Sequence, residues 1–239
     1  VYVRGSSVLQ MLLVMLGEEA FWASMQRYTQ ENAHSLVDTD DLREAFEAVT
    51  GRHLTWFFDQ WVHLGGSPKL VLQHSHREGQ LTINLQQSHE GGEASRLFTL
   101  PIDLEIGTAE GVIERRVWME QADLRLVVDL EEAPTYVALD PHGGLLASLE
   151  NKQSAAMWRA QLDSPSPYAR LQAIRELGKK EMDEANLESL ARLLAPSQDE
   201  TTRLVAIEAL QNLGDPRGAP LLVESMGSDP SGMVRASAA

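Results

Sequence analysis

The sequence predicts a multi-domain protein of mixed α and β structure, in which helices come first, strands follow and helices return. Three observations support this order: apolar residues at helical spacing in the first part, alternation with a period of two in the middle, and an internal helical repeat at the end. We expect the domain limits at residues 1–66, 67–145 and 146–239. The middle part is predicted to be a small antiparallel β-sandwich, and the last part an α-solenoid.

The first predicted domain consists of four short helices. An apolar stripe at helical spacing, formed by Phe21, Met25 and Tyr28, marks one of them. The next is expected to begin at Thr39, whose hydroxyl would cap a free amide, and to end at Gly51. The fourth spans residues 54–62 and is rich in aromatic side chains, which we interpret as core packing and not as a ligand pocket.

The second predicted domain shows the alternation that is typical of strands with one buried face. The alternating apolar residues are Leu81, Ile83 and Leu85, then Phe98, Leu100, Ile102, Leu104 and Ile106, then Leu124, Leu126, Val128 and Leu130. Turn-rich stretches separate these short segments. A small sandwich of antiparallel strands, ending near residues 140–144, is therefore expected.

The third predicted domain contains a weak internal repeat. Arg170, Arg203 and Arg235 open similar phrases of the form Arg-x-x-Ala, separated by 33 and then 32 positions. Paired helices with such a period form a solenoid, because each pair buries its apolar face only against its neighbours. The phrase resembles that of HEAT-like repeats. We expect the solenoid to continue past Ala239 or to be capped, since the sequence stops within a helical pattern.

Composition limits the possible functions. The 239 residues include 20 Lys and Arg against 35 Asp and Glu, so the formal net charge is −15. This argues against nucleic-acid binding, because contacts to phosphates need a basic face. The chain has no Cys, which excludes Cys-based zinc sites and Cys nucleophiles. No apolar run approaches the length of a membrane span, so no transmembrane segment is expected.

The seven His residues do not form a recognisable metal motif. The signature His-Glu-x-x-His is absent, and the nearest match, residues 89–93, contains two glycines and is interpreted as a hairpin loop. His74 and His76 could form a partial ligand pair on one strand face, but without a third ligand a solvated strand end is favoured. A nucleophile elbow, a P-loop, a dinucleotide fingerprint and a calcium loop are also absent.

A family resemblance begins at the first helix. Residues 2–12 have the form Tyr-x-Arg-Gly-x-x-x-Leu-x-x-Leu, and further phrases follow in order at 16–21, 39–42, 51–61 and 66–68. Together they resemble the aminopeptidase N family of zinc metallopeptidases. The resemblance implies that the first domain is the C-terminal helical part of a zincin catalytic domain, followed by the β-sandwich and the HEAT-like α-solenoid.

The resemblance also implies where the chemistry lies. In that family zinc is held by the two His of His-Glu-x-x-His and by a later Glu, and a Gly-x-Met-Glu-Asn segment binds the amino terminus of the substrate. None of these elements occurs in this sequence, so the chain is expected to begin after the metal site and to bind no metal or cofactor itself. The family's catalytic Tyr matches Tyr2, whose phenol would donate a hydrogen bond to the oxyanion of the reaction. Arg4 stands where Lys is usual, and no substrate contact is assigned to it.

The expected function is that of a C-terminal segment of a zinc-dependent aminopeptidase, which supplies Tyr2 and the scaffold domains. The parent protein is expected to be an enzyme with peptide substrates, whereas this segment alone is expected to be inactive, because the zinc ligands are absent. An alternative is a non-catalytic protein-interaction scaffold of the same family, and a weaker one is a free-standing sandwich and solenoid. Protein partners on the solenoid and a cytoplasmic location are further expectations.

Overall fold

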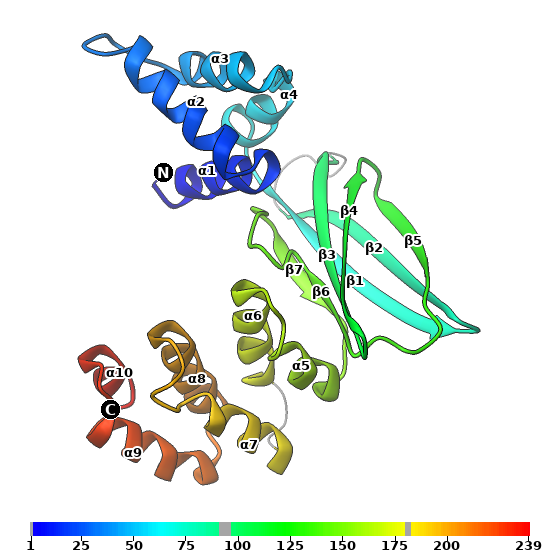
Figure 1. Ribbon diagram of the computed structural model, residues 1–239, viewed down its shortest axis with the longest axis vertical. Coiled ribbons are helices and arrows are strands. Elements are labelled where there is room, and N and C mark those ends of the chain that lie inside the picture. Colours follow the sequence, from blue (N-terminus) through cyan, green and yellow to red (C-terminus); the bar gives the residue numbers. More distant parts are fainter. Residues whose placement is uncertain (1, 91–96, 180–182) are drawn as a thin grey trace.

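The computed structural model describes residues 2–90, 97–179 and 183–239, except for the side chains of residues 2, 3 and 90. A helical layer, two β-sheets and a second helical layer follow one another along the chain (Figure 1). The first layer contains α1 (Tyr2–Leu16), α2 (Glu18–Glu31), α3 (Thr39–Thr50), α4 (Thr55–Phe58) and the π-helical turn η1 (Asp59–His63). The described residues of this layer thus form the short helices that the sequence predicts.

Helix α3 has a different N-cap from the expected one. The cap is Asp38 and not Thr39. The Asp38 carboxylate accepts hydrogen bonds from the amides of Asp40 and Asp41, at 2.8 and 3.2 Å. The Asp41 carboxylate in turn accepts the Asp38 amide at 2.8 Å, which completes a reciprocal capping box. The expected end at Gly51 is confirmed, with a left-handed φ of 65°.

Two sheets follow the first helical layer. One has the strand order β5-β2-β1-β7 and the other the order β4-β3-β6. The strands are β1 (Ser67–Arg77), β2 (Gln80–Glu90), β3 (Leu100–Thr108), β4 (Gly111–Met119), β5 (Asp123–Asp129), β6 (Tyr136–Leu139) and β7 (Ser148–Asn151). Hydrogen-bonded neighbours are antiparallel, except for β1 and β7.

One apolar core joins both sheets and the first helical layer. Alternate residues of β2 and β3 are buried in it, which confirms the period-two pattern of these strands. Leu81 and Ile83 represent β2, and Leu100 and Ile102 represent β3. The same cluster contains Leu12 of α1 together with residues of α3, α4 and η1. Because burial of apolar surface is the main stabilising term, the helices and sheets that share this cluster are expected to unfold together.

The aromatic residues of α4 and η1 belong to this core, as the sequence predicts. Phe57, Phe58 and Trp61 are at most 2% exposed. Trp56 is partly buried, and its ring meets that of Trp118 on β4 nearly edge to face, with centroids 5.9 Å apart. These side chains pack the end of the first helical layer against the sheets.

Strand β7 is not predicted by the sequence. It lies beyond residue 145, where helical repeats are expected, and it pairs with β1 in parallel and not antiparallel. Its four residues include a single apolar one and show no alternation, so the local pattern carries no strand signal. Pairing over a long sequence distance fixes its place, and the Lys152 amide extends the ladder by donating to the Leu72 carbonyl at 3.0 Å.

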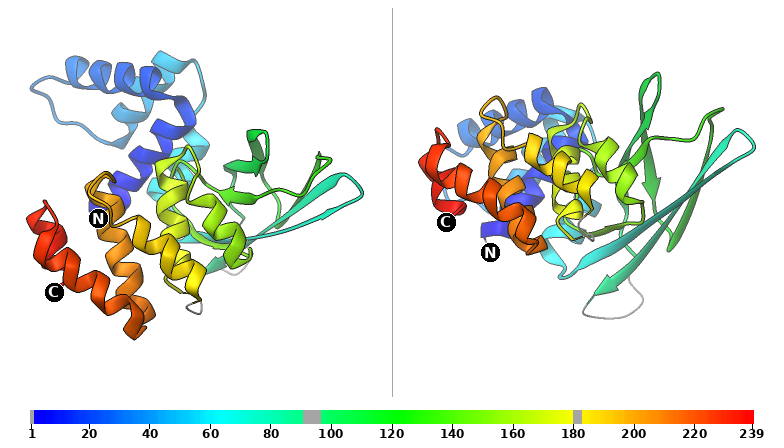
Figure 2. Two further views of the ribbon diagram at one scale, coloured as in Figure 1. Left: turned by 60° about the horizontal axis from the view of Figure 1, so that its bottom comes forward. Right: turned by 90° about the horizontal axis from the view of Figure 1, so that it is seen from below.

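The last layer consists of helix pairs. Its elements are α5 (Ala155–Gln161), α6 (Pro167–Leu177), α7 (Glu184–Arg192), α8 (Glu200–Leu213), the 3-10 turn η2 (Pro216–Gly218), α9 (Ala219–Ser228) and α10 (Gly232–Ser237). In both views of Figure 2, α9 and α10 lie on the side of the molecule away from the sheets. A second apolar cluster joins α5 to α8, and a smaller one joins α8 to α10.

The three repeat arginines share one role. Each lies in the second helix of a pair and turns its guanidinium back to carbonyls five or six residues earlier. Arg170 Nη1 donates to the Ser164 carbonyl at 2.8 Å, and Arg235 Nη1 donates to the Asp229 carbonyl at 2.7 Å. Arg203 makes the equivalent bond and also a buried ion pair with the Asp229 carboxylate. The period in the sequence therefore reflects a cation that holds the turn before each of these helices.

Candidate functional site at the start of helix α1

The single catalytic candidate from the sequence, Tyr2, is the first residue of α1. Its side chain lies outside the described part of the structure. The described neighbours nevertheless show how this first helical turn is held. The most important of them is Arg4, two positions further along the helix.

Arg4 fastens the first turn of α1 to the end of η1. Its Nη1 donates to the Gly66 carbonyl at 3.0 Å. Its Nε donates to the Trp61 carbonyl at 3.2 Å, and its Nη2 to the Leu64 carbonyl at 3.4 Å. The last carbonyls of a helix lack intrahelical partners and carry partial negative charge, so a cation is stabilised there. The Arg4 guanidinium, near the start of α1, is thus bound at the C-terminal end of η1.

The geometry explains why Arg can occupy this position. Three carbonyl oxygens surround the Arg4 side chain, and a guanidinium offers donors in a fixed planar fork that reaches all three. A Lys ammonium is a single point of donation on a flexible stem. The planar group therefore fixes the direction of the helix start more tightly than a Lys would.

Gly66 is required at the turn that accepts Arg4. Its φ of +88° lies in the region that favours glycine. A Cβ at this position would lie 2.2 Å from Cε1 of the His89 ring, which no side chain could tolerate without a shift. The His89 ring in turn lies beside Phe98 of the core, with centroids 5.6 Å apart. This packing accounts for the glycine at position 66.

An apolar groove of about 540 Å³ runs along α1 from Arg4. It is formed by α1, α3 and the α4–η1 segment. Its lining consists of Arg4, Gly5, Val8, Leu9, Leu12, Thr39, Leu42, Phe58, Trp61 and Val62. The indole Nε1 of Trp61 is buried and has no hydrogen-bond partner in the described structure. The groove places an apolar surface beside the helical turn that begins with Tyr2.

The loop between β6 and β7 connects this helical layer to the repeats. Its Asp140 is 1% exposed and accepts two backbone amides of the same loop, at 2.7 and 3.1 Å. Burial raises the pKa of Asp140 to about 6, although the two amides act in the opposite direction. A Cβ at Gly144 would clash with Val14 of α1. A Cβ at Gly143 would clash with the Tyr168 ring of α6, so the loop is closely packed on both sides.

A second buried acid lies where the sheet meets the repeats. Glu105 of β3 is fully buried, and its Oε1 accepts the hydroxyl of Tyr136 at 2.7 Å and the hydroxyl of Ser164. Its Oε2 has no partner in the described structure. Burial and the hydrogen bond to Glu105 raise the pKa of Tyr136, which therefore remains a donor. The cluster links β3 and β6 to the turn before α6.

The described residues contain no group of three or more His, Asp or Glu side chains that could hold a metal ion. His76 Nε2 lies 2.6 Å from the Leu130 carbonyl, while Nδ1 of His74 is buried without a partner, and burial lowers the pKa of His74. His89 is the second-last residue of β2 and is not part of a hairpin loop as expected, because that strand continues to Glu90, beyond its alternating apolar residues. Residues 91–93 of that motif lie outside the described residues. The side chains described here do not fit a zinc site.

Glutamines that the sequence pattern does not single out hold the irregular segment before β3. Gln60 of η1 pairs with the backbone of Thr99, as donor at 3.0 Å and as acceptor at 2.8 Å. Gln87 pairs with the backbone of Phe98 in the same way, at 3.0 and 2.9 Å. The signal that could have identified Gln60 is its position beside Trp61, because a polar residue within an aromatic core run needs a partner.

The fold and this site define a class of protein: a chain in which a helical layer is followed by two β-sheets and then by helix pairs. Residues 1–61 match the Peptidase family M1 domain, and residues 155–239 match HEAT repeats. The chain is therefore similar to the M1 peptidase family in its first 61 residues and to HEAT repeats in its last 85. Among the described residues, no helix combines the length and hydrophobicity needed to cross a bilayer.

Individual relatives agree with this assignment. The chain is 31% identical over 112 residues to "Aminopeptidase M1" of Arabidopsis thaliana, which covers 46% of this chain and 12% of that protein. It is 32% identical over 88 residues to "Aminopeptidase N" of Haemophilus influenzae, covering 37% of this chain and 10% of that protein. The match thus spans about an eighth or less of these relatives. The structure of Legionella pneumophila aminopeptidase A in complex with aspartic acid shares the fold, with a TM-score of 0.68, 14% identity and coverage of 95% of this chain and 31% of that one.

Proposed function

We propose that this chain is the C-terminal segment of a zinc-dependent aminopeptidase and that Tyr2 is its catalytic residue. The observation that carries the proposal is the set of hydrogen bonds from Arg4 to the carbonyls of Trp61, Leu64 and Gly66, called the Arg4 clamp below. This clamp fixes the first turn of α1 within the segment that matches the M1 domain. The Tyr2 hydroxyl would donate a hydrogen bond to the oxyanion that develops on the scissile carbonyl. Oxyanion donors of this kind contribute about 2.7 to 4 kcal/mol to transition-state stabilisation.

In this proposal zinc is bound by residues of the longer protein that are not part of this chain. The side chains described here do not provide a ligand set, so no catalytic step is assigned to a metal on this segment. The 239-residue chain alone is then inactive, because a hydrogen-bond donor has no reaction to stabilise without the rest of the active site. Peptides bound by the whole protein would be the substrates, and a cytoplasmic location remains a prediction.

The remaining domains would act as a scaffold. We infer that the two sheets form a small sandwich over residues 67–145, extended by β7 to Asn151, and that the helix pairs of residues 146–239 form an α-solenoid. The apolar cluster shared by the first helices and the sheets supports a buttressing role for the sheets. The solenoid would curve over the active site of the whole protein and limit access to peptides.

The test uses the longer protein that contains this segment. Tyr2→Phe should lower kcat by about 10²- to 10³-fold, because one oxyanion donor is lost, while zinc content and thermal stability stay unchanged. Tyr28→Phe is the matched control, since it removes a hydroxyl from α2 in the same helical layer and should leave kcat unchanged. Near-normal turnover of the Tyr2→Phe protein would overturn the assignment. A longer protein without zinc and activity would favour the alternative of a non-catalytic interaction scaffold.

A further inference from the structure

β7 is an edge strand of the four-stranded sheet, and among the described residues no further strand pairs with it. β7 pairs with β1 on one side and forms the end of the order β5-β2-β1-β7. The backbone groups of successive residues in a strand point to opposite sides. Because the Lys152 amide donates to the Leu72 carbonyl of β1, Ser148 and Glu150 also direct their amide and carbonyl groups toward β1. Leu149 and Asn151 therefore present their amide and carbonyl groups to the free edge. An exposed strand edge of this kind can pair with another extended chain.

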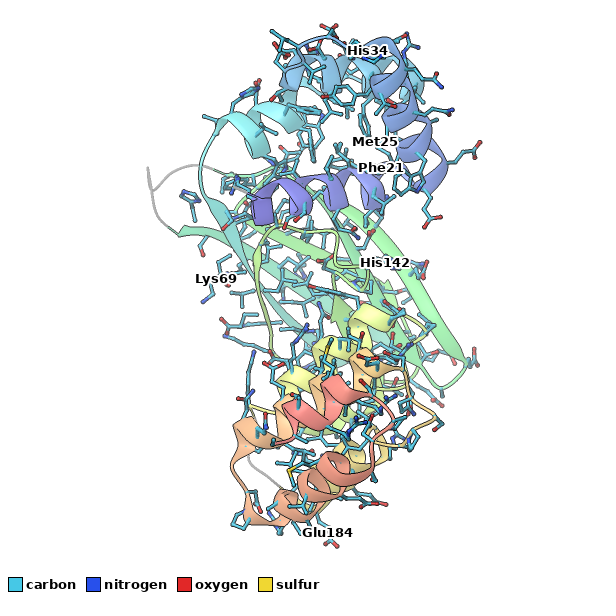
Figure 3. The ribbon with its side chains drawn as sticks, turned by 90° about the vertical axis from the view of Figure 1, so that its left-hand side faces the viewer. Phe21, Met25, His34, Lys69, His142 and Glu184 are labelled. Atoms are coloured by element: carbon cyan, nitrogen blue, oxygen red, sulfur yellow. The ribbon has the colours of Figure 1, made fainter. Side chains whose placement is uncertain are left out.

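A polar cleft of about 700 Å³ lies along this edge. It is bounded by the chain from Ser148 to Ser154, by residues of β1, and by Met157, Glu176 and Lys179 of the repeats. Figure 3 shows Lys69 of β1 on the side of the molecule, between the first helical layer and the repeats. The cleft therefore separates a β-strand edge from the helices that face it.

Lysines are concentrated in this cleft. The sequence contains four lysines, and three of them, Lys69, Lys152 and Lys179, line it. Two carboxylates form ion pairs with them. The Glu150 carboxylate oxygens lie 3.2 Å from Lys69 Nζ and 3.7 Å from Lys152 Nζ. The Glu176 carboxylate pairs with Lys179 Nζ. Three cations thus face two anions in a protein whose net charge is −15. The cleft is therefore locally more basic than the rest of this acidic chain. Its cations favour the approach of acidic ligands.

These ion pairs leave room for a ligand. The side chains of Lys69, Lys152 and Lys179 are 35%, 53% and 66% exposed. Exposed ion pairs contribute little to stability, so the ammonium groups can turn toward an incoming carboxylate at small cost. Lysines on a strand edge also discourage uncontrolled pairing between sheets, which is the competing explanation for their position.

We propose that this cleft binds an extended acidic peptide segment, which adds a strand to β7 and places its carboxylates against Lys69, Lys152 and Lys179. Main-chain hydrogen bonds to Leu149 and Asn151 would hold the backbone, and the lysines would select acidic side chains. A strand has a period of two, so alternate acidic residues would face the lysines. The binding does not depend on Tyr2 or on zinc, and it is testable on this chain alone.

The probe is a fluorescein-labelled octapeptide of alternating Glu and Thr, whose binding is followed by fluorescence anisotropy at low salt. We expect saturable binding that weakens at high salt, and weaker binding of the matched peptide of alternating Gln and Thr. A Glu-Thr peptide with N-methyl groups on alternate residues should also bind at least tenfold more weakly, because it cannot complete the strand ladder. The variant K69Q/K152Q should weaken binding roughly tenfold, since each exposed charge pair contributes up to about fivefold.

The matched control lies on the opposite edge of the same sheet. R125Q removes one exposed cation from β5 and should leave binding unchanged. Circular dichroism should show the same fold in all variants, because the substituted side chains are exposed or partly exposed. Equal weakening by R125Q would reveal non-specific attraction and overturn the proposal. Equal binding of the N-methylated peptide, together with its displacement by inorganic phosphate, would show an anion site without strand pairing and would also overturn it.

Discussion

The buried ion pair between Arg203 and Asp229 connects two successive repeats and offers a quantitative test of the repeat interface. Arg203 Nε and Nη2 donate to the two carboxylate oxygens at 2.8 and 3.1 Å. The two side chains are 6% and 3% exposed. The guanidinium lowers the pKa of Asp229, so this carboxyl remains charged at neutral pH. Replacing Arg203 by Met would leave that charge buried without its cation.

The expected cost of Arg203→Met is about 3 kcal/mol, the lower end of the range for breaking a buried pair. The lower end applies because the Ser231 amide still donates to Asp229 at 2.8 Å. Arg170→Met is the matched control, since Arg170 bonds the carbonyls of its own turn without a bidentate carboxylate partner, and should cost about 1 kcal/mol.

Urea unfolding followed by far-UV circular dichroism, with hydrogen exchange to locate the change, measures this difference. Arg203→Met should accelerate exchange in α8 and α10 and lower the free energy of unfolding of the repeats more than Arg170→Met does. The double variant R203M/D229N should recover most of the loss, because Asn is neutral and keeps an acceptor for Ser231. Equal costs for the two Arg variants, or no recovery in the double variant, would refute this reasoning.

Three further predictions follow from the other contacts. Because burial raises the pKa of Asp140 from 3.8 to about 6, this carboxyl binds a proton between these pH values in the folded chain but not in the unfolded chain. The contribution of Asp140 to stability should therefore rise by about 3 kcal/mol as pH falls from about 6 to 4, and denaturation curves of Asp140→Asn should lack this contribution when compared with the unsubstituted chain. Gly178→Ala should destabilise the repeats by about 1 to 3 kcal/mol in the same assay, because its Cβ would lie 2.8 Å from the Ala209 Cα, whereas Gly218→Ala meets only ordinary contacts and should be nearly neutral. Arg4→Met should lower the free energy of unfolding by about 1 to 2 kcal/mol and speed exchange in the first turn of α1, and unchanged exchange there would contradict the clamp.

The parts of the fold that follow from the sequence are those with a strong local pattern. Alternation over five positions in residues 98–106 predicted β3. The helix end at Gly51 was predicted because glycine favours the left-handed conformation that ends helices, and its φ of 65° confirms this. The cap of α3 was misplaced by one residue because Asp38 and Thr39 are both good caps, and the choice depends on Asp41 reaching back. Strand β7 has four residues, and β1, with which it pairs, lies far away in the chain.

The sequence predicts the candidate site at Tyr2, but it does not predict the contacts that hold this helical turn. The phrase around Tyr2 carries the family resemblance, whereas the role of Arg4 depends on carbonyls 57 to 62 residues away. Hydrogen bonds to backbone carbonyls leave no trace in side-chain patterns, since any residue has a carbonyl. The cleft beside β7 is likewise not predictable from the sequence, because Lys69 and Lys152 come close together only when β7 pairs with β1.

The central claim is that this chain completes an aminopeptidase whose metal site lies in another part of the protein. Zinc content and hydrolysis of a chromogenic aminoacyl substrate, measured on the 239-residue chain and on the longer protein, test it most directly. The account predicts zinc and activity in the longer protein alone. Zinc-dependent activity in the short chain, or the absence of both zinc and activity from the longer protein, would contradict it.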